Sequence, residues 1–163
     1  MLKIENESEV NRLIDLEFLK PLAEKYGIVE VCVDDDPIFP LRDDIARIEY
    51  GFCSGRYHLR LNQRIDKEKA AAFLRLRTGL KIRPDEVYYY AIFHEIGHIY
   101  DKESPFNAGA LAARPFFLNK IYPPTGKLMT WDQIKLDKLR AEELANEFAK
   151  REFKKWRARK KKI

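Results

Sequence analysis

Near the N-terminus, apolar side chains recur at spacings of three and four residues, which predicts a helix over residues 7–26. Gly27 is expected to end this helix, because glycine is common just past a helix C-terminus. The apolar positions that define the pattern are Val10, Leu13, Ile14, Leu16, Leu19, Leu22 and Ala23. The chain is therefore expected to open with one amphipathic helix.

The next part of the chain alternates apolar and polar residues with a period of two, which is typical of β-strands. Strands are expected at residues 28–36, 46–53 and 57–63. Ser54 and Gly55 mark a tight turn between the second and third strands, and so short a turn predicts an antiparallel hairpin. The pattern thus predicts a small three-stranded, largely antiparallel sheet.

Helical spacing returns after the strands, over residues 66–79 and over Pro84–Asp101. A long irregular segment, residues 104–129, carries four prolines and two glycines and separates these helices from the last one, expected from Trp131 onward. The order of helix, strands and helices indicates an α+β fold in a single domain, residues 1–163, with helices packed on the sheet.

The charge is unevenly distributed along the chain, which has a formal net charge of +5. Residues 148–163 hold nine Lys or Arg residues and one Glu, so this tail is strongly basic while the rest of the chain is mildly acidic. A basic tail can contact nucleic acid or an anionic surface. It can equally be a solvated helix end, because cations suit the negative C-terminal pole of a helix.

The composition excludes a membrane protein and argues for a cytoplasmic one. No apolar run approaches the ~18–20 residues that cross a bilayer, and the N-terminus lacks the apolar core of a signal peptide. Cys32 and Cys53 do not form a C-x-x-C pair, so reduced and buried thiols are expected.

The helix predicted over 84–101 contains the motif HEIGH, formed by His94, Glu95 and His98. Residues four apart lie on one helix face, so both imidazoles can bind one zinc ion. Glu95 is rotated by about 100° from His94 and can accept a proton from a metal-bound water. From Val87 to Tyr100, Glu95 is the one formally charged residue. The alternative is a buried helix whose histidines bond to backbone and whose glutamate forms a salt bridge.

A catalytic zinc needs a third protein ligand, and the segment AEELANEFA, residues 141–149, offers two glutamates. Glu142 shares a helix face with Ala145, Asn146 and Ala149, where small residues allow close packing, whereas Glu143 faces outward. Glu142 is therefore preferred, with Asn146 expected to bond the outer nitrogen of a ligating histidine. Glu143, or His58 upstream, is the alternative ligand, and both glutamates can instead be surface charges.

The motif HEIGH followed by E-x-x-A-N-x-F-A resembles the gluzincin metallopeptidases, and most closely the ImmA/IrrE-type peptidase domain and the short minigluzincins. The resemblance implies a zinc-dependent peptidase with His94, His98 and Glu142 as ligands and Glu95 as the catalytic base. It also implies that an edge strand above the site, here residues 57–62, binds an extended peptide or protein substrate by strand addition.

Two further residues are candidates for contacting the substrate or for stabilising the oxyanion formed when water attacks a carbonyl. They are His58, on the polar face of a strand, and Tyr100, at the end of the motif helix; a surface histidine and a core aromatic are the alternatives. A different class of function is a regulatory or nucleic-acid-binding protein that keeps zinc for structure or sensing. The basic tail with Trp156 is the main support for that class.

Overall fold

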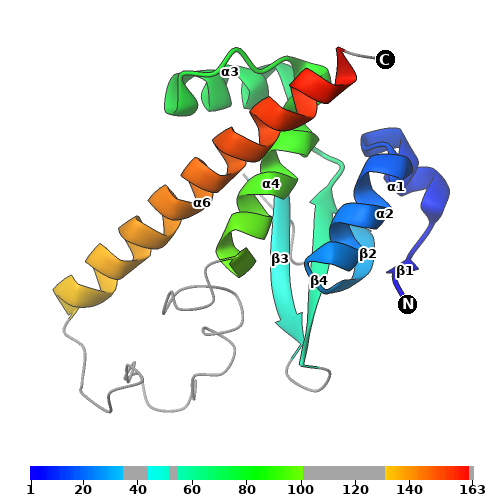
Figure 1. Ribbon diagram of the computed structural model, residues 1–163, viewed down its shortest axis with the longest axis horizontal. Coiled ribbons are helices and arrows are strands. Elements are labelled where there is room, and N and C mark those ends of the chain that lie inside the picture. The colour runs from blue at the N-terminus through cyan, green and yellow to red at the C-terminus, as the bar shows by residue number, and fades with distance from the viewer. Residues whose placement is uncertain (35–43, 52–54, 101–130, 162–163) are drawn as a thin grey trace.

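The computed structural model describes residues 1–34, 44–51, 55–100 and 131–161, and within them it is an α+β fold (Figure 1). Four strands form one mixed sheet, and the described residues also form five α-helices and one 3-10 helix. In chain order the elements are β1 (Lys3–Ile4), α1 (Glu7–Leu13), α2 (Leu16–Lys25), β2 (Ile28–Asp34), β3 (Ala46–Gly51), β4 (Arg56–Asn62), α3 (Lys67–Thr78), the 3-10 turn η1 (Pro84–Glu86), α4 (Val87–Tyr100) and α6 (Trp131–Lys160).

The sheet corrects the expectation of three largely antiparallel strands, because its order is β1-β2-β4-β3. β3 and β4 form the expected antiparallel hairpin, but β2 pairs in parallel with β4 and also with the added strand β1. β4 therefore lies inside the sheet, and β3 is the edge strand beside the motif helix. The two-residue β1 is too short to produce a readable alternation.

The single helix expected over residues 7–26 is also wrong, because the chain breaks it into α1 and α2. Ile14 is extended, with φ −153° and ψ 145°. Asp15 then accepts a hydrogen bond from the backbone N–H of Glu17 and begins a new helix as its N-cap. The helical spacing of apolar residues continues across the break between α1 and α2, because Ile14 and Leu19 are both buried in the same core.

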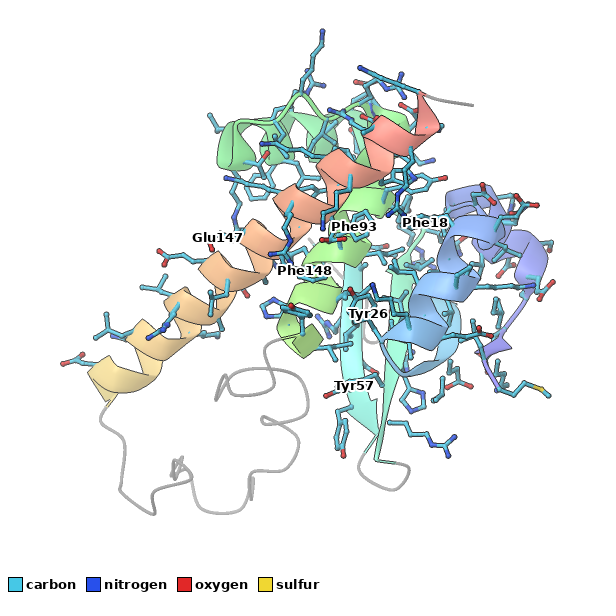
Figure 2. The ribbon with its side chains drawn as sticks, in the orientation of Figure 1. Phe18, Tyr26, Tyr57, Phe93, Glu147 and Phe148 are labelled. Atoms are coloured by element: carbon cyan, nitrogen blue, oxygen red, sulfur yellow. The ribbon has the colours of Figure 1, made fainter. Side chains whose placement is uncertain are left out.

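The helices α1, α2 and α4 pack against one face of the sheet, and this layer forms the core (Figure 1). Apolar residues of the strands alternate toward the helices, as the sequence pattern predicts. Phe18 of α2 lies edge-on to Phe93 of α4, with 5.5 Å between the ring centres (Figure 2). The fully buried strand side chains on this face are Val31, Leu59 and Leu61.

Helix α6 packs directly on α4, and Gly97 sets how close the two helices come. A Cβ built on Gly97 would lie 2.7 Å from the Cα of Ala145 and 2.9 Å from its carbonyl oxygen. Ala141, Ala145 and Ala149 are buried along the same side of α6. The glycine in HEIGH and the alanines of AEELANEFA therefore let the two helix backbones approach, as the small residues of α6 predicted.

The basic C-terminal part of α6 is built into the fold and is not a detached extension. Phe153 is fully buried, and Trp156 stacks on Tyr89 with 4.3 Å between the ring centres. Arg157 donates from Nε to Glu86 of η1 over 2.9 Å. Trp156 is thus partly buried against the core, so its presence in the basic tail is explained by packing. Many exposed Lys and Arg side chains remain on the outer surface of this segment.

Among the described helices, none is long and apolar enough to cross a membrane. Cys32 is buried, as expected for a structural thiol, and burial raises its pKa. The loop expected at 104–129, Cys53 and the last two residues of the tail lie outside the described residues.

Candidate metal centre

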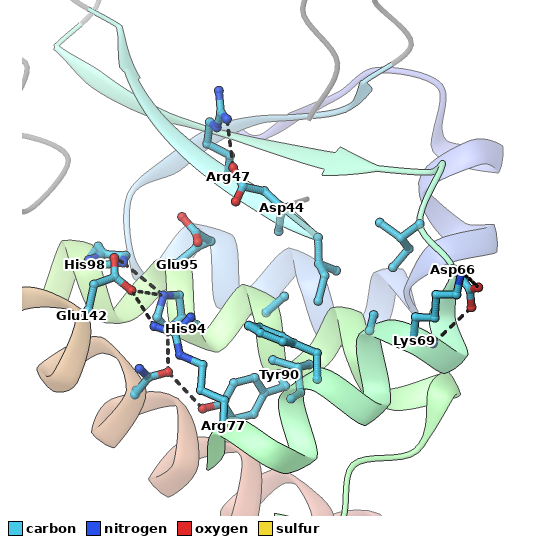
Figure 3. A pocket seen from close by; sticks show the side chains of 18 of the residues that line it. Asp44, Arg47, Asp66, Lys69, Arg77, Tyr90, His94, Glu95, His98 and Glu142 are labelled. Atoms are coloured by element: carbon cyan, nitrogen blue, oxygen red, sulfur yellow. Dashed lines mark hydrogen bonds and ion pairs between the residues drawn. The ribbon is translucent and has the colours of Figure 1, made fainter. Parts of the chain in front are cut away.

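Three side chains from two helices converge on one point at the contact between α4 and α6 (Figure 3). The Nε2 atoms of His94 and His98 are 3.2 Å apart. The carboxylate of Glu142 lies 3.3 Å from each of them, with Oε2 toward His94 and Oε1 toward His98. All three side chains are partly buried, so they are accessible from one side only.

The spacing of these donor atoms fits a zinc ion. Nitrogen ligands about 2.0–2.1 Å from a tetrahedral zinc are separated from each other by about 3.3 Å. The observed separations of 3.2 and 3.3 Å match that edge length. Two imidazoles and one carboxylate are also a donor set that catalytic zinc sites use. The residues present therefore suit zinc with one position left for water.

The structure separates the two candidate glutamates. Glu142 points at the histidines, whereas Glu143 is exposed on the outside of α6. Helix geometry explains the difference, since one residue of helix corresponds to a rotation of about 100°. Glu142 shares its face with the buried Ala145, which packs on Gly97. Glu147, one turn beyond Glu143, lies on the outer side of α6 as well (Figure 2).

Asn146 lies behind His94, one turn after Glu142. Its Oδ1 is 3.1 Å from Nδ1 of His94 and accepts a bond of 3.4 Å from the hydroxyl of Tyr90. Because a carboxamide oxygen only accepts, Nδ1 of His94 carries the proton and Nε2 presents its lone pair to the convergence point. Burial raises the pKa of Tyr90 to about 12, so this phenol stays a donor.

Glu95 lies beside the three converging groups, on the side of the sheet. Its Oε2 accepts a 3.0 Å hydrogen bond from the backbone N–H of Ile48 in β3. Burial raises the pKa of Glu95, and this outweighs the opposing effects of His94, His98 and the Ile48 N–H. A carboxylate with a raised pKa that is held by one backbone donor is suited to accept a proton and release it again.

The carboxylate of Glu142 and the imidazoles of His94 and His98 influence one another's pKa in the absence of an ion. The imidazoles of His94 and His98 beside the Glu142 carboxylate hold its pKa well below its usual range. Burial lowers the pKa of His98, but the hydrogen bond to Glu142 and the negative charge of Glu95 outweigh it and raise that pKa. The negative carboxylates therefore make the point between the histidines attractive to a cation.

A cleft of about 810 Å³ opens onto this point (Figure 3). α4 lines it with the motif residues, α6 with Glu142 and Asn146, and the beginning of β3 with Ala46 and Arg47. Helix α3 forms the opposite wall, including an exposed Phe73 and the guanidinium of Arg77. The volume is within the range of small-ligand and peptide-side-chain sites.

The structure does not bring His58 or Tyr100 to the cleft. His58 lies on the face of the sheet opposite the helices, with Nδ1 2.8 Å from Glu30. Tyr100 is 59% exposed, and its ring lies 4.9 Å from that of Phe148 on the far side of the α4–α6 contact. Neither residue lines the described cleft, because His58 lies on the sheet face away from the helices and Tyr100 lies on another face of α4.

The expectation that residues 57–62 form the edge strand is wrong for a related reason. These residues belong to β4, whose two edges are taken by β2 and β3. β3 is the edge strand among the strands that the structure describes, and the N–H of Ile48 points out of the sheet to Glu95. In an antiparallel ladder alternate residues face outward, so Ala46 and Tyr50 share the outward orientation of Ile48.

Arg77 was not identified from the sequence. It lies on α3, and its Nη2 is 3.4 Å from Oε2 of Glu142, 65 positions later in the chain. In the sequence it resembles any cation in the last turn of a helix that ends at Gly79. Only the packing of α3 beside α4 and α6 brings it to the site.

Comparisons of the chain with protein-family models, with curated proteins and with solved structures give no match. The geometry of the site therefore carries the argument about function.

Proposed function

We propose that this protein is a zinc-dependent metallopeptidase of the gluzincin type, similar to the ImmA/IrrE-type domains. The observation that carries the proposal is the convergence of His94, His98 and Glu142 with ligand separations of 3.2–3.3 Å. Glu95 beside them and the cleft in front of them add the parts that a purely structural metal site does not need. Structural zinc sites are usually closed by four protein ligands.

In this proposal the three ligands hold the ion and Glu95 moves the proton. Zinc, when bound, supplies a positive charge for a carbonyl oxygen and lowers the pKa of a coordinated water. Glu95 accepts a proton from the attacking water as its oxygen bonds to the carbonyl carbon. The same carboxyl group then delivers that proton to the nitrogen as the C–N bond breaks. Asn146 keeps the His94 ring in the tautomer and orientation that binding requires.

The proposed substrate is an extended peptide lying along the free edge of β3. Outward-facing backbone groups at Ala46, Ile48 and Tyr50 offer hydrogen bonds for strand addition. The hydrogen bond from Ile48 to Glu95 fixes the position of the proton-transfer group relative to this edge. A peptide bound along the edge would therefore lie at a defined distance from Glu95. This places the role first expected of residues 57–62 on the neighbouring strand.

The test is cleavage profiling of the zinc-reconstituted protein against a peptide library, with Glu95→Gln as the matched variant. Gln keeps the size of the side chain and the acceptor for Ile48 but cannot carry a proton. We expect Glu95→Gln to bind zinc in the same stoichiometry and to lose cleavage by at least ~10²-fold, the usual contribution of a general base. Identical cleavage profiles for the two proteins would remove the peptidase proposal.

A further inference from the structure

Arg77 is a positively charged group beside the candidate metal centre to which the proposed reaction has so far given no part. Its Nη2 lies 3.4 Å from Oε2 of Glu142, the oxygen that also lies 3.3 Å from His94. The side chain is 45% exposed and lines the cleft. A guanidinium has five N–H donors, and within the described residues Glu142 is its one hydrogen-bond partner.

Arg77 and Glu95 approach the three ligands from opposite walls of the cleft. Glu95 is bonded to the edge strand β3, whereas Arg77 extends from α3. Figure 3 shows His94 between the two side chains, with Glu95 toward the sheet and Arg77 toward α3. If water attacks a carbonyl carbon from the side of Glu95, the carbonyl oxygen can lie toward the opposite wall. Arg77 is the residue that reaches the site from that wall.

Two other donors in the described lining of the cleft already have partners. The Tyr90 hydroxyl is buried and donates to Asn146, whose oxygen is in turn occupied by His94. Arg47, on the β3 wall, is paired with Asp44 over 2.9 Å. Among the described residues, Arg77 is the one Lys or Arg that pairs with Glu142, and its side chain is 45% exposed in the cleft.

We infer that Arg77 donates a hydrogen bond to the oxygen of the scissile carbonyl as that oxygen becomes negative. Water forms a bond to the carbonyl carbon, the π electrons move to the oxygen, and Arg77 stabilises the charge. When the C–N bond breaks, those electrons re-form the carbonyl and Glu95 supplies the proton to nitrogen. This inference rests on the proposed peptidase function and names the anion-stabilising residue of the same site.

A merely structural role for Arg77 gives a different result. If it only held Glu142 in place, removing it would weaken zinc binding, and activity would fall in proportion to the zinc lost. If it stabilises the oxyanion, zinc affinity stays nearly constant while kcat falls and KM does not. Binding of a tetrahedral anion to the zinc-loaded protein separates the two roles without any turnover.

The experiment compares Arg77→Met and Arg77→Lys with Arg75→Met, a control that removes an exposed arginine from the same helix outside the cleft. Three quantities are measured: zinc affinity by chelator competition, calorimetric affinity of the zinc-loaded protein for N-phosphoryl-L-leucinamide, and kcat and KM on a peptide that the wild type cleaves. We expect Arg77→Met to lower kcat by about 10²–10³-fold and to weaken the phosphoryl probe comparably, with zinc affinity within about threefold. Arg77→Lys should recover part of both losses.

The inference is overturned if Arg77→Met equals Arg75→Met in kcat and in probe affinity, or if its losses follow an equal loss of zinc. A wild type that holds zinc but does not bind the probe overturns it as well. A wild type that holds zinc and binds the probe but cleaves no peptide contradicts the proposed function, while the probe still reports on Arg77. A wild type that binds no zinc removes both.

Discussion

Glu142 and Glu143 are adjacent in the chain but lie in opposite environments. Two imidazoles and one guanidinium surround Glu142, whereas Glu143 is exposed on the outer face of α6. The same chemical change at the two positions therefore separates a ligand from a surface charge. No other adjacent pair in the described part of the site offers so close a control.

We expect Glu142→Gln to weaken zinc binding by at least ~10²-fold, because an amide oxygen is a poorer zinc ligand than a carboxylate and removes one negative charge. Glu143→Gln should change zinc affinity by less than about threefold. Chelator competition and metal analysis after dialysis measure both. If zinc is lost only in Glu143→Gln, the ligand assignment is wrong.

At the scale of elements, the site depends on how closely α4 and α6 pack. Gly97 contacts the backbone of Ala145, and Glu142 lies three residues before that contact. A larger residue at position 97 would push α6 outward and carry the Glu142 carboxylate away from the histidines. The glycine of HEIGH is therefore part of the candidate metal site although it offers no ligand.

Gly97→Ala tests this packing through the sign of its effect on stability. In an unhindered helix the change would stabilise by about 1 kcal/mol, because alanine has the higher helix propensity. Here the added Cβ meets backbone atoms at 2.7 and 2.9 Å, so we expect destabilisation of about 1–3 kcal/mol and weaker zinc binding. Urea unfolding measures the first effect and chelator competition the second.

The control for Gly97→Ala is Ala72→Gly at an exposed position of α3, which reports helix propensity in this protein. Ala145→Gly combined with Gly97→Ala should not restore stability, because the contacts are to the backbone of residue 145 and not to its side chain. A stabilising effect of Gly97→Ala would contradict the close packing.

Much of the element pattern could be predicted from the sequence, and the errors have physical causes. Periodicity located α3, α4 and the β3–β4 hairpin because those segments have clear spacing and turn residues. Periodicity did not determine the order of the strands in the sheet. The alternation of apolar and polar residues predicts which face of the sheet a side chain lies on, but not which strand is its neighbour. It also joined α1 to α2, because Ile14 continues the apolar spacing although its backbone is extended.

The site residues divide in the same way. His94, Glu95, His98, Glu142 and Asn146 could be proposed because each lies on a helix whose faces follow from spacing. Arg77 and the Ile48 N–H could not, since both depend on contacts between elements far apart in the chain. His58 and Tyr100 show the converse, because residue type favoured them while the orientation of their elements keeps both out of the described lining of the cleft.

At the scale of the whole molecule, the C-terminal segment is part of the core. Loss of a buried phenylalanine such as Phe153 costs about 3–5 kcal/mol, which is a large share of the ~5–15 kcal/mol that holds a typical domain folded. Truncating the basic tail would therefore unfold the protein and could not test nucleic-acid binding. Substituting exposed residues such as Lys154 and Lys155 with Gln leaves the packing in place and tests the charge alone.

The ion pair between Glu86 and Arg157 connects this C-terminal segment to the turn that precedes α4, and it should make stability depend on pH. Glu86 is 3% exposed; burial raises its pKa, but hydrogen bonds from Arg157 and Arg83 outweigh that effect and the pKa is lowered. A carboxylate with a lowered folded pKa contributes stability above its unfolded pKa of about 4.3. That contribution is lost as the pH falls through the folded value.

We expect Glu86→Gln to lower the free energy of unfolding by about 1–3 kcal/mol at pH 7, because it leaves Arg157 without its charged partner. The difference between wild type and variant should begin to shrink as the pH falls below about 5, because the unfolded chain then takes up a proton at Glu86 before the folded protein does. Urea unfolding of the metal-free proteins at several pH values measures it. Asp85→Asn, at the exposed neighbour of Glu86, should cost less than about 0.5 kcal/mol at every pH. A difference for Glu86→Gln that stays constant from pH 7 to 3 would mean that its charge does not hold the C-terminal segment in place.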